Sequence, residues 1–477
     1  MAASSPSYRV YDHRLEIHDL NKLYDVIDHF ASNPDQELQV TDIDIGDELE
    51  TSESDEDKMS DMEGPRGFDD TSRIIASIID GIHSTGGLES FRWVRDVDEK
   101  GATREVCFWS NLWDTARTLK YLDIRFFEHE LHRFANLTGD ESIPRPPKFP
   151  ALKSLRIDAS GGHGDNGSMV DQILRNAPGL EELTLIFPGC DLEACRIKGI
   201  TWEYTFPALK RFSISTYNSD NTALSKFLAS HPTITTLDWN VDADEELILP
   251  PACLPNLRVL KLDSMDVLGA LDAVSTAISI SPRPIIRIGV EDCSHDSLSK
   301  VAVFAKTLKS LDLNIYVNEL RPDSDSDEEI ENKARNEEET AGLLHNILKN
   351  LLLQLHDLQE LGFDLETGNT YISSGVRGKS EHPEPIGVKD LISILNILPP
   401  STRIHTLRMS DSRGLKLPDE ILNQFPDIPK SLEYLKWDTG KRAVLYRLER
   451  GAGKVRAVPF QVPVQNIHVQ PETRQSA

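Results

Sequence analysis

The chain has 477 residues, of which 39% are hydrophobic and 27% are charged, and its formal net charge is −27. This apolar content is high enough for a folded core and too high for a chain that is disordered throughout. The strong negative charge argues against a nucleic-acid backbone or an anionic membrane surface as the general partner. We therefore expect neither a nucleic acid nor a membrane among the partners.

The start of the chain, Met1–Pro6, has no basic residues and no apolar core of the kind that a secretory signal needs. No window of about 18 consecutive apolar residues is present, so we expect no membrane-spanning helix. The five cysteines are sparse and odd in number, which does not fit a disulfide framework. These features favour an intracellular location, either cytoplasmic or nuclear.

An apolar hexamer of the form L-x-x-L-x-L recurs along the chain, with other large apolar residues allowed at the three fixed positions. It starts at residues 88, 119, 152, 180, 209, 234, 257, 285, 308, 358, 404 and 432, and a weaker copy starts at Val40. Successive starts from 88 to 308 are 23–33 residues apart. The last two apolar residues of each hexamer alternate along a short strand and point to one face of a sheet. Such a period is typical of a solenoid, in which neighbouring units stack to bury their apolar faces.

Helices are predicted between the strands. The isoleucines of residues 71–83 are spaced for one helical face, and Ser168 with Asp171 matches a capping box. Further helices are predicted over residues 221–231, 267–280, 298–308, 389–398 and 420–425. Proline precedes several hexamers, as in Phe206-Pro207, where it ends a helix and favours extended backbone. The repeating unit is therefore a helix, a turn with proline and a strand.

This pattern resembles the repeats of leucine-rich-repeat proteins, in particular the irregular repeats of fungal F-box/leucine-rich-repeat proteins. The resemblance is carried by phrases such as Phe149-Pro-Ala-Leu-Lys-Ser-Leu-Arg-Ile157 and Leu254-Pro-Asn-Leu-Arg-Val-Leu-Lys-Leu262, and covers about residues 35–440. It implies an α/β horseshoe solenoid with short parallel strands on the concave face and helices on the convex face. The Asn or Cys that usually follows the strand in such repeats is mostly absent, and only Cys293 matches it.

Composition divides the chain into segments. We expect an N-terminal capping segment (1–40), an acidic disordered insertion (41–70), the leucine-rich-repeat solenoid (71–440), a basic C-terminal capping hairpin (441–462) and a loose tail (463–477). Residues 41–63 hold 11 acidic residues and one lysine, and residues 320–339 hold nine acidic and three basic residues. Both stretches interrupt the repeat period, as does the polar stretch 366–385, so we expect loops at these places.

In proteins of the F-box type, an N-terminal helical module binds a Skp-type adaptor of a ubiquitin ligase. The nearest candidate here is Leu20–Phe30, which lacks the usual Leu-Pro start and a second helix. We interpret it as the convex-side helix of a degenerate first repeat, with Leu15–Ile17 as its strand. The alternative is a degenerate F-box that makes the chain a substrate-recognition subunit of a Skp–cullin ligase.

No combination of residues typical of a catalytic, cofactor or metal site is found in the sequence. His129 and His132 lack the glutamate of a zinc-protease helix, and Cys190 with Cys195 lacks a second cysteine pair. The glycine-rich turn Gly161–Gly167 lacks the Gly-Lys-Ser/Thr of a phosphate-binding loop and fits a flexible connection. We therefore expect no enzymatic activity, no cofactor and no metal. A hydrolase or nucleotide-binding enzyme that uses this turn is a less favoured alternative.

Function is then expected to reside on a surface, and the concave face is the usual binding surface of solenoids. Its side chains are expected two, four and six positions after the start of each hexamer. The candidate partner-binding residues are Arg92, Arg125, Arg156, Arg211, Asp238, Asp263, Glu291, Asp312, Glu360 and Asp364. Residues of opposite charge are expected beside them on the same face, namely Asp123, Asp158 and Glu182 in the first half and Lys261 and Arg287 in the second. Together they predict a face that changes from nearly neutral to acidic along the array. We expect a monomeric, non-catalytic protein-interaction scaffold that resembles a substrate receptor and binds another protein.

Serines precede carboxylates in both acidic segments, a context that acidophilic kinases prefer. The candidate phosphorylation sites are Ser52, Ser54, Ser324 and Ser326. Each phosphate would add about −1.5 to −2 charges. We expect this charge to extend the loops or to strengthen their binding to a basic partner or to the basic segment 441–456; a purely solubilising role is the alternative.

Overall fold

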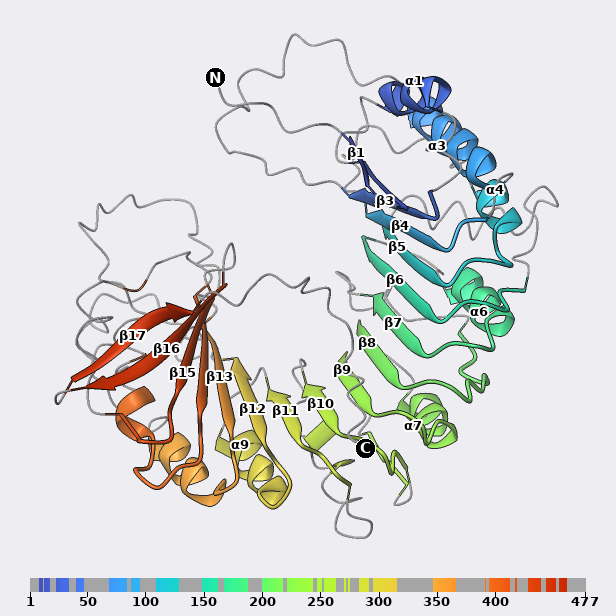
Figure 1. Cartoon of the computed structure of the whole chain (residues 1–477). Helices are drawn as coiled ribbons and strands as arrows, with labels where there is room; N and C mark the ends of the chain where they lie inside the picture. The colour runs from blue at the N-terminus through green and yellow to red at the C-terminus, as the bar shows by residue number, and fades with distance from the viewer. Residues whose placement is uncertain are drawn as a thin grey trace, which may run out of the picture. The chain divides into compact units, whose positions relative to one another are not determined.

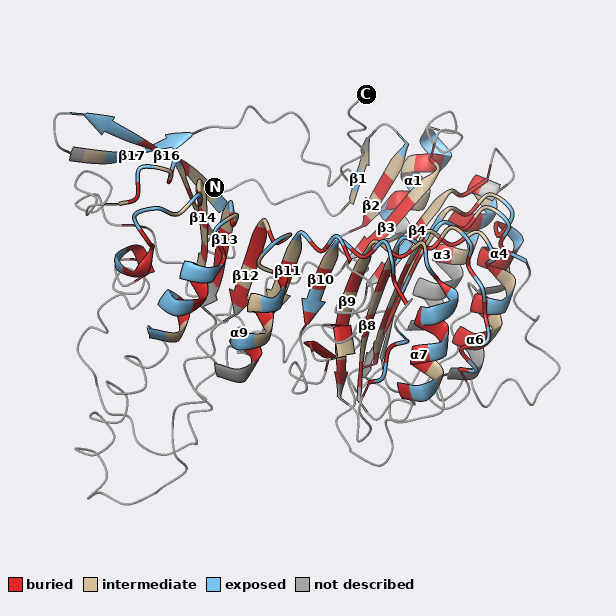
Figure 2. Cartoon of the chain, turned by 90° about the horizontal axis from the view of Figure 1, so that it is seen from below, coloured by how far each residue is buried: buried red, intermediate tan, exposed pale blue. Residues whose placement is uncertain are grey.

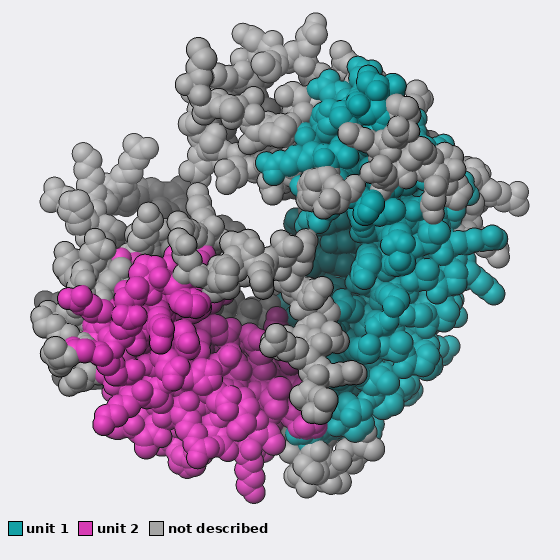
Figure 3. Space-filling view, in the orientation of Figure 1, with its two compact units in different colours: residues 1–257, 277–283 teal, residues 258–276, 284–477 magenta. Residues whose placement is uncertain are grey.

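The computed structural model describes residues 8–11, 13–17, 23–33, 40–46, 68–83, 87–94, 109–127, 148–161, 167–187, 200–217, 221–242, 247–250, 253–262, 270–271, 273–274, 283–290, 295–314, 346–365, 391, 394–411, 417, 428–438, 443–451 and 454–460. No helix in this part of the chain is both long enough and apolar enough to cross a membrane. The chain divides into two compact units (Figure 3). Unit 1 comprises residues 1–257 and 277–283, and unit 2 comprises residues 258–276 and 284–477.

Unit 1 is built on an open mixed sheet whose described strands follow one another in chain order. The strands are β1 (Tyr8–Tyr11), β2 (Arg14–Ile17), β3 (Asp42–Gly46), β4 (Ser90–Val94), β5 (Tyr121–Phe127), β6 (Ser154–Gly161), β7 (Glu182–Phe187), β8 (Arg211–Tyr217) and β9 (Thr236–Asp242). From β2 to β9 each strand pairs in parallel with the next, whereas β1 is antiparallel to β2. Each parallel connection crosses back over the sheet, which is the arrangement that stacked repeats require.

Unit 2 repeats this plan with a different ending. Its described strands are β10 (Val259–Leu262), β11 (Arg287–Val290), β12 (Ser310–Asn314), β13 (Glu360–Leu365), β14 (Thr406–Asp411), β15 (Tyr434–Asp438), β16 (Ala443–Gly451) and β17 (Lys454–Phe460). Strands β10 to β15 are parallel, whereas β15, β16 and β17 pair in antiparallel fashion. Strands β16 and β17 form a hairpin within residues 441–462, where one was predicted, and it extends the sheet of unit 2.

The described helices of each unit lie on one face of its sheet (Figure 1). In unit 1 they are α1 (Leu23–Ser32), α3 (Phe68–His83), α4 (Trp109–Asp114), α6 (Gly167–Asn176) and α7 (Asn221–Ser230). In unit 2 they are α9 (His295–Val301) with the 3-10 turn η3 (Ala302–Phe304), and the helical residues 346–354 and 394–397. The opposite face of each sheet, on which no described helix lies, is named the helix-free face.

The core lies between each sheet and its helices (Figure 2). All three fixed positions of every hexamer are buried; in the hexamer that starts at Leu152, for example, Leu152, Leu155 and Ile157 are at most 1% exposed. A strand begins two residues after the start of each hexamer, and the apolar residues of neighbouring strands stand in register, as Leu155 does with Leu183. The predicted strands and the burial of their apolar positions are therefore confirmed.

The residue before each recurrent proline closes the core at the start of the strand. Phe149, Phe206, His231 and Leu254 occupy this place in successive turns and are at most 1% exposed. His231 replaces an apolar side chain by bonding with both ring nitrogens. Its Nε2 accepts the Phe206 N–H at 2.9 Å, and its Nδ1 lies 2.6 Å from the Phe227 carbonyl oxygen, so the proton resides on Nδ1.

Several predictions need correction or extension. Strand β3 occupies residues 42–46, at the start of the segment predicted as a disordered insertion, and β2 continues the parallel sheet into the predicted N-terminal cap. Each of the two compact units has strands in one sheet with its described helices on one face, as predicted. Strand β1 and helix α4 were not predicted. Residues 420–425 and most of the two acidic segments lie outside the described residues.

Candidate functional site

The helix-free face of unit 1 presents the polar side chains of consecutive strands in straight rows. Strand alternation turns every residue between two buried hexamer positions toward this face. The parallel register places Asp44, Arg92, Asp123 and Arg156 side by side on β3, β4, β5 and β6. Negative and positive side chains therefore alternate across four neighbouring strands.

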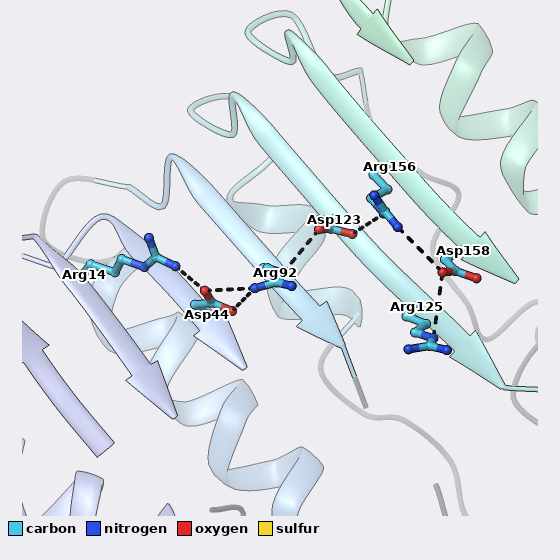
Figure 4. Close-up of polar contacts among 7 residues, drawn as sticks. All are labelled: Arg14, Asp44, Arg92, Asp123, Arg125, Arg156 and Asp158. Carbon is cyan, nitrogen blue, oxygen red and sulfur yellow. Dashed lines mark hydrogen bonds and ion pairs between the residues drawn. The ribbon is translucent and has the colours of Figure 1, made fainter. Parts of the chain in front are cut away.

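Seven side chains on this face form a continuous chain of ion pairs, which we name the arginine–carboxylate ladder (Figure 4). It consists of Arg14, Asp44, Arg92, Asp123, Arg125, Arg156 and Asp158. Arg14 contacts Asp44, whose carboxylate also accepts hydrogen bonds of 3.4 Å from Arg92. Asp123 lies 3.4 Å from Nε of Arg92 and 3.7 Å from Nε of Arg156.

The far end of the ladder is held by Asp158. Its Oδ2 lies 3.9 Å from Nη2 of Arg156 and 3.8 Å from Nε of Arg125. Each ladder carboxylate thus bridges two guanidinium groups, and each bridge connects different strands except where Arg156 and Asp158 share β6. The ladder runs across five strands of the sheet and orders its arginines without any help from the helices.

The two kinds of charge differ in exposure. The side chains of Asp44 and Asp158 are 11% and 12% exposed, whereas those of Arg92 and Arg156 are 48% and 49% exposed. The carboxylates therefore lie deep, and the guanidinium groups form the outer layer of the face. Long side chains lose conformational entropy when they are fixed. Because the carboxylates already hold the arginines in place, less of this entropy is lost when a partner binds.

Asp123 occupies an unfavourable place for an anion. Burial raises the pKa of its carboxyl above the ordinary value, and this effect exceeds the opposing effect of Arg156 and Arg92. The neighbouring carboxylates of Asp44 and Asp158 raise it further. The surroundings of the central carboxylate therefore disfavour its ionised form.

The helix-free face of unit 2 carries a smaller cluster around Asp312 on β12. Arg287 on β11 donates to Asp312 Oδ2 at 2.9 and 3.1 Å, and Arg408 on β14 lies 2.5 Å from Oδ1. Arg408 also donates to Ser310 at 3.2 Å and lies 3.8 Å from Glu360. Asp312 and Glu360, two of the carboxylates that were predicted to make this face acidic, are therefore compensated by arginines.

The structure places the predicted partner-binding residues as follows. Arg92, Arg125, Arg156, Arg211, Asp238, Asp312 and Glu360 lie on the helix-free face of their unit, and Asp364 belongs to β13. Asp263, Glu291 and the serines Ser52, Ser54, Ser324 and Ser326 lie outside the described residues. The prediction missed Arg14, Asp44 and Arg408. Asp44 and Arg408 stand four positions after the hexamer starts Val40 and Ile404, so the same rule would have found them.

On the helix side of unit 1, Asp171 does not act as the partner of Ser168 in a capping box, so this prediction is corrected. Its Oδ1 accepts the Tyr204 hydroxyl and the Thr201 N–H, the latter at 3.0 Å, and its Oδ2 accepts Nε of Arg175 at 2.6 Å. Burial alone would raise the pKa of Asp171, but these hydrogen bonds lower it below the ordinary value. Asp171 thus connects α6 to the loop before β8 and has a structural role.

The residues of the predicted alternatives are placed only in part. In α1, the apolar residues Val26 and Phe30 are at most 3% exposed, so this part of the F-box candidate faces the core of unit 1. His129, His132, Cys190, Cys195 and residues 162–166 of the glycine-rich turn lie outside the described residues.

The described residues contain no group of three or more His, Cys, Asp and Glu side chains that could hold a metal ion. Burial raises the pKa of the Cys253 thiol to about 11 against the opposing effect of Arg283, so this cysteine is a poor nucleophile at neutral pH.

Comparison with protein-family models and with curated proteins found no match for this chain. Among the residues that the structure describes, the arginine–carboxylate ladder joins seven side chains and is larger than the cluster around Asp312.

Proposed function

We propose that this chain is a non-catalytic protein-interaction scaffold of the leucine-rich-repeat type, similar to a substrate receptor, which binds a protein partner through the helix-free face of unit 1. The observation that supports this proposal is the ladder itself. Partly buried carboxylates fix a row of half-exposed arginines on consecutive strands. Such a row presents donors in a fixed geometry over a broad area, which suits a protein surface better than a small substrate.

The neighbouring strands support the same interpretation. The helix-free face continues from the ladder through Thr184 on β7 and Ser213 on β8 to Asp238 on β9, and all three side chains are partly exposed. Short polar side chains of this kind leave the sheet accessible to a partner. A broad, mixed polar surface on a rigid sheet is typical of specific and reversible protein recognition.

The proposal is tested by site-specific photocrosslinking with the full-length chain in an extract of the cells that make it. A photoreactive residue replaces Thr184 or Ser213 on the helix-free face, and Ala229 at an exposed position of α7 serves as the matched control on the helix side. We expect discrete crosslinked proteins from positions 184 and 213 and none of them from position 229. The proposal is wrong if the three positions give the same products, or if neither position on the helix-free face gives any.

A further inference from the structure

Tyr121 lies on the helix-free face of unit 1, at the start of a strand in the interior of the sheet. Its side chain belongs to the first residue of β5, and its neighbours in the parallel register are Ser90 on β4 and Ser154 on β6. Because both neighbours are small, no large side chain in register covers the sides of the tyrosine ring. Tyr121 is 50% exposed, although it stands on a strand in the interior of the sheet.

Two arginines flank Tyr121 along the same neighbouring strands. Arg92 follows Ser90 by two residues on β4, and Arg156 follows Ser154 by two residues on β6. These strands are two apart, so their backbones are separated by about 9–10 Å. In the register Asp123 stands between Arg92 and Arg156, and Tyr121 lies two residues before it on β5, diagonal to both half-exposed arginines.

Arg156 retains most of its hydrogen-bonding capacity. Its ion pairs with Asp123 and Asp158 measure 3.7 and 3.9 Å, beyond hydrogen-bond distance, and no hydrogen bond links its guanidinium to any of the described residues. A guanidinium has five N–H donors in a planar fork that fits a carboxylate. Arg156 is thus oriented by charge, and its donors are available to a partner.

The charge balance of the surface restricts the partner further. The ladder holds nearly as many carboxylates as guanidinium groups, so a polyanion such as a nucleic-acid backbone would meet Asp44, Asp123 and Asp158 as well as the arginines. A segment with one carboxylate next to an apolar side chain avoids this repulsion. Tyrosine and arginine are also the residue types that most often dominate the energy of protein interfaces.

We propose that Tyr121, Arg92 and Arg156 form the recognition centre of this face. The partner is a protein segment whose carboxylate binds the guanidinium of Arg156 while an adjacent apolar side chain covers the ring of Tyr121. Arg92 completes the site from the other neighbouring strand, diagonal to Tyr121 and separated from Arg156 by Asp123. This inference rests on the proposed function, since it names the kind of segment that the helix-free face of unit 1 binds.

The test is a selection of displayed random short peptides on the immobilised full-length chain. The variants are Tyr121→Ser and Arg156→Gln. The matched control is Arg117→Gln with Lys226→Gln, two exposed cationic residues outside the helix-free face. Circular dichroism and thermal unfolding of each variant establish that it is folded. We expect enriched peptides that combine Asp or Glu with a neighbouring Leu, Phe or Trp, bound about tenfold more weakly by each face variant and equally by the control.

The outcomes separate the inference from the proposed function. Synthetic versions of the enriched peptides with Glu replaced by Gln should lose binding to the wild-type chain and show no difference between wild type and Arg156→Gln. The proposed recognition centre is wrong if the enriched peptides lack carboxylates, or if they bind both face variants as tightly as they bind the wild type. If such peptides still crosslink to photoreactive residues at positions 184 and 213, the helix-free face of unit 1 is the binding surface, and only the assignment of its recognition centre is wrong.

A further experiment tests whether the site prefers a carboxylate or a phosphate. The same synthetic peptides carry phosphoserine in place of Glu. Binding that is about tenfold tighter for the phosphorylated form would show that a phosphate, and not a carboxylate, is the preferred group, which contradicts the proposal. Equal or weaker binding of the phosphorylated form agrees with it.

Discussion

Asp312 and Arg408 contact each other at 2.5 Å although a complete strand, β13, lies between the strands that carry them. Gly362 on β13 makes this contact possible, because a Cβ atom at this position would lie 2.1 Å from Oδ1 of Asp312. The position of a glycine thus determines which charges can meet on the helix-free face of unit 2.

We expect Gly362→Ala to destabilise unit 2 by about 1 kcal/mol, since Asp312 must turn away and lose Arg408 as its partner. Chemical denaturation monitored by tryptophan fluorescence measures the change. Gly289→Ala is the matched control, because its new Cβ would meet Lys261 at an ordinary distance of 3.5 Å. Equal effects of the two substitutions would refute this role of Gly362.

The hexamer residues should carry the stability of each unit. Leu183 and Leu260 are at most 1% exposed, so replacement by Ala should cost about 2–5 kcal/mol at either position. Thr184→Ala, on the opposite face of the same strand as Leu183, should change stability by less than about 0.5 kcal/mol. Hydrogen exchange should show that loss of Leu183 loosens the strands around β7 first, because repeats contact mainly their neighbours. Small effects of both leucine substitutions would contradict the strand register.

His231 should make unit 1 sensitive to acid. Burial lowers the pKa of its imidazole, with the Phe227 carbonyl opposing the shift, so the folded state favours the neutral ring. The stabilisation is fully present above the unfolded pKa of about 6.5 and is lost as the pH falls through the folded value. A protonated Nε2 also cannot accept the Phe206 N–H.

The variant His231→Phe tests this prediction, since phenylalanine occupies the same place in the turns at Phe149 and Phe206. At neutral pH we expect a loss of about 1–3 kcal/mol, because the Phe206 N–H is left without a partner. Between about pH 6.5 and pH 5 the variant should lose less stability than the wild type. His356→Gln, at an exposed turn, should keep the wild-type pH dependence, and an identical pH profile for His231→Phe would contradict the assignment.

Two aspartates should respond to the same substitution in opposite ways. Asp171 has a lowered pKa, so its stabilisation is present above the unfolded pKa of about 3.9 and is lost as the pH falls below it. Asp171→Asn should therefore destabilise unit 1 at neutral pH by about 1–3 kcal/mol. The stability of the variant should also change less than that of the wild type as the pH falls into the acid range.

Asp123 has a raised pKa, so the stability it contributes is greatest below the unfolded value and is lost as the pH rises through the folded value. Asp123→Asn should then leave stability at neutral pH unchanged or slightly higher. Urea denaturation of both variants over a range of pH distinguishes these behaviours. A large loss of stability at neutral pH in Asp123→Asn would show that its ion pairs with Arg92 and Arg156 outweigh its burial.

Much of the architecture could be predicted from the sequence because the signal is local. In Leu152-Lys-Ser-Leu155-Arg-Ile157, the spacing of the apolar residues already determines which side chains are buried, and all of them are. The same spacing places Arg156 on the opposite face. The arginines of the candidate site therefore followed from counting positions within single strands. Arg14 was missed because the strand Leu15–Ile17 has Asp12 where a hexamer would begin with an apolar residue.

Only the tertiary structure decided which charged groups meet. Asp44 and Arg92 are 48 residues apart in the chain, and their contact depends on the register of β3 and β4. Asp171 was assigned to a helix cap from its local sequence, but Tyr204, 33 residues later, determines its role. The physical reason is that burial of apolar side chains follows a short period along one strand, whereas ion pairs and hydrogen bonds depend on distances between strands that no local pattern records.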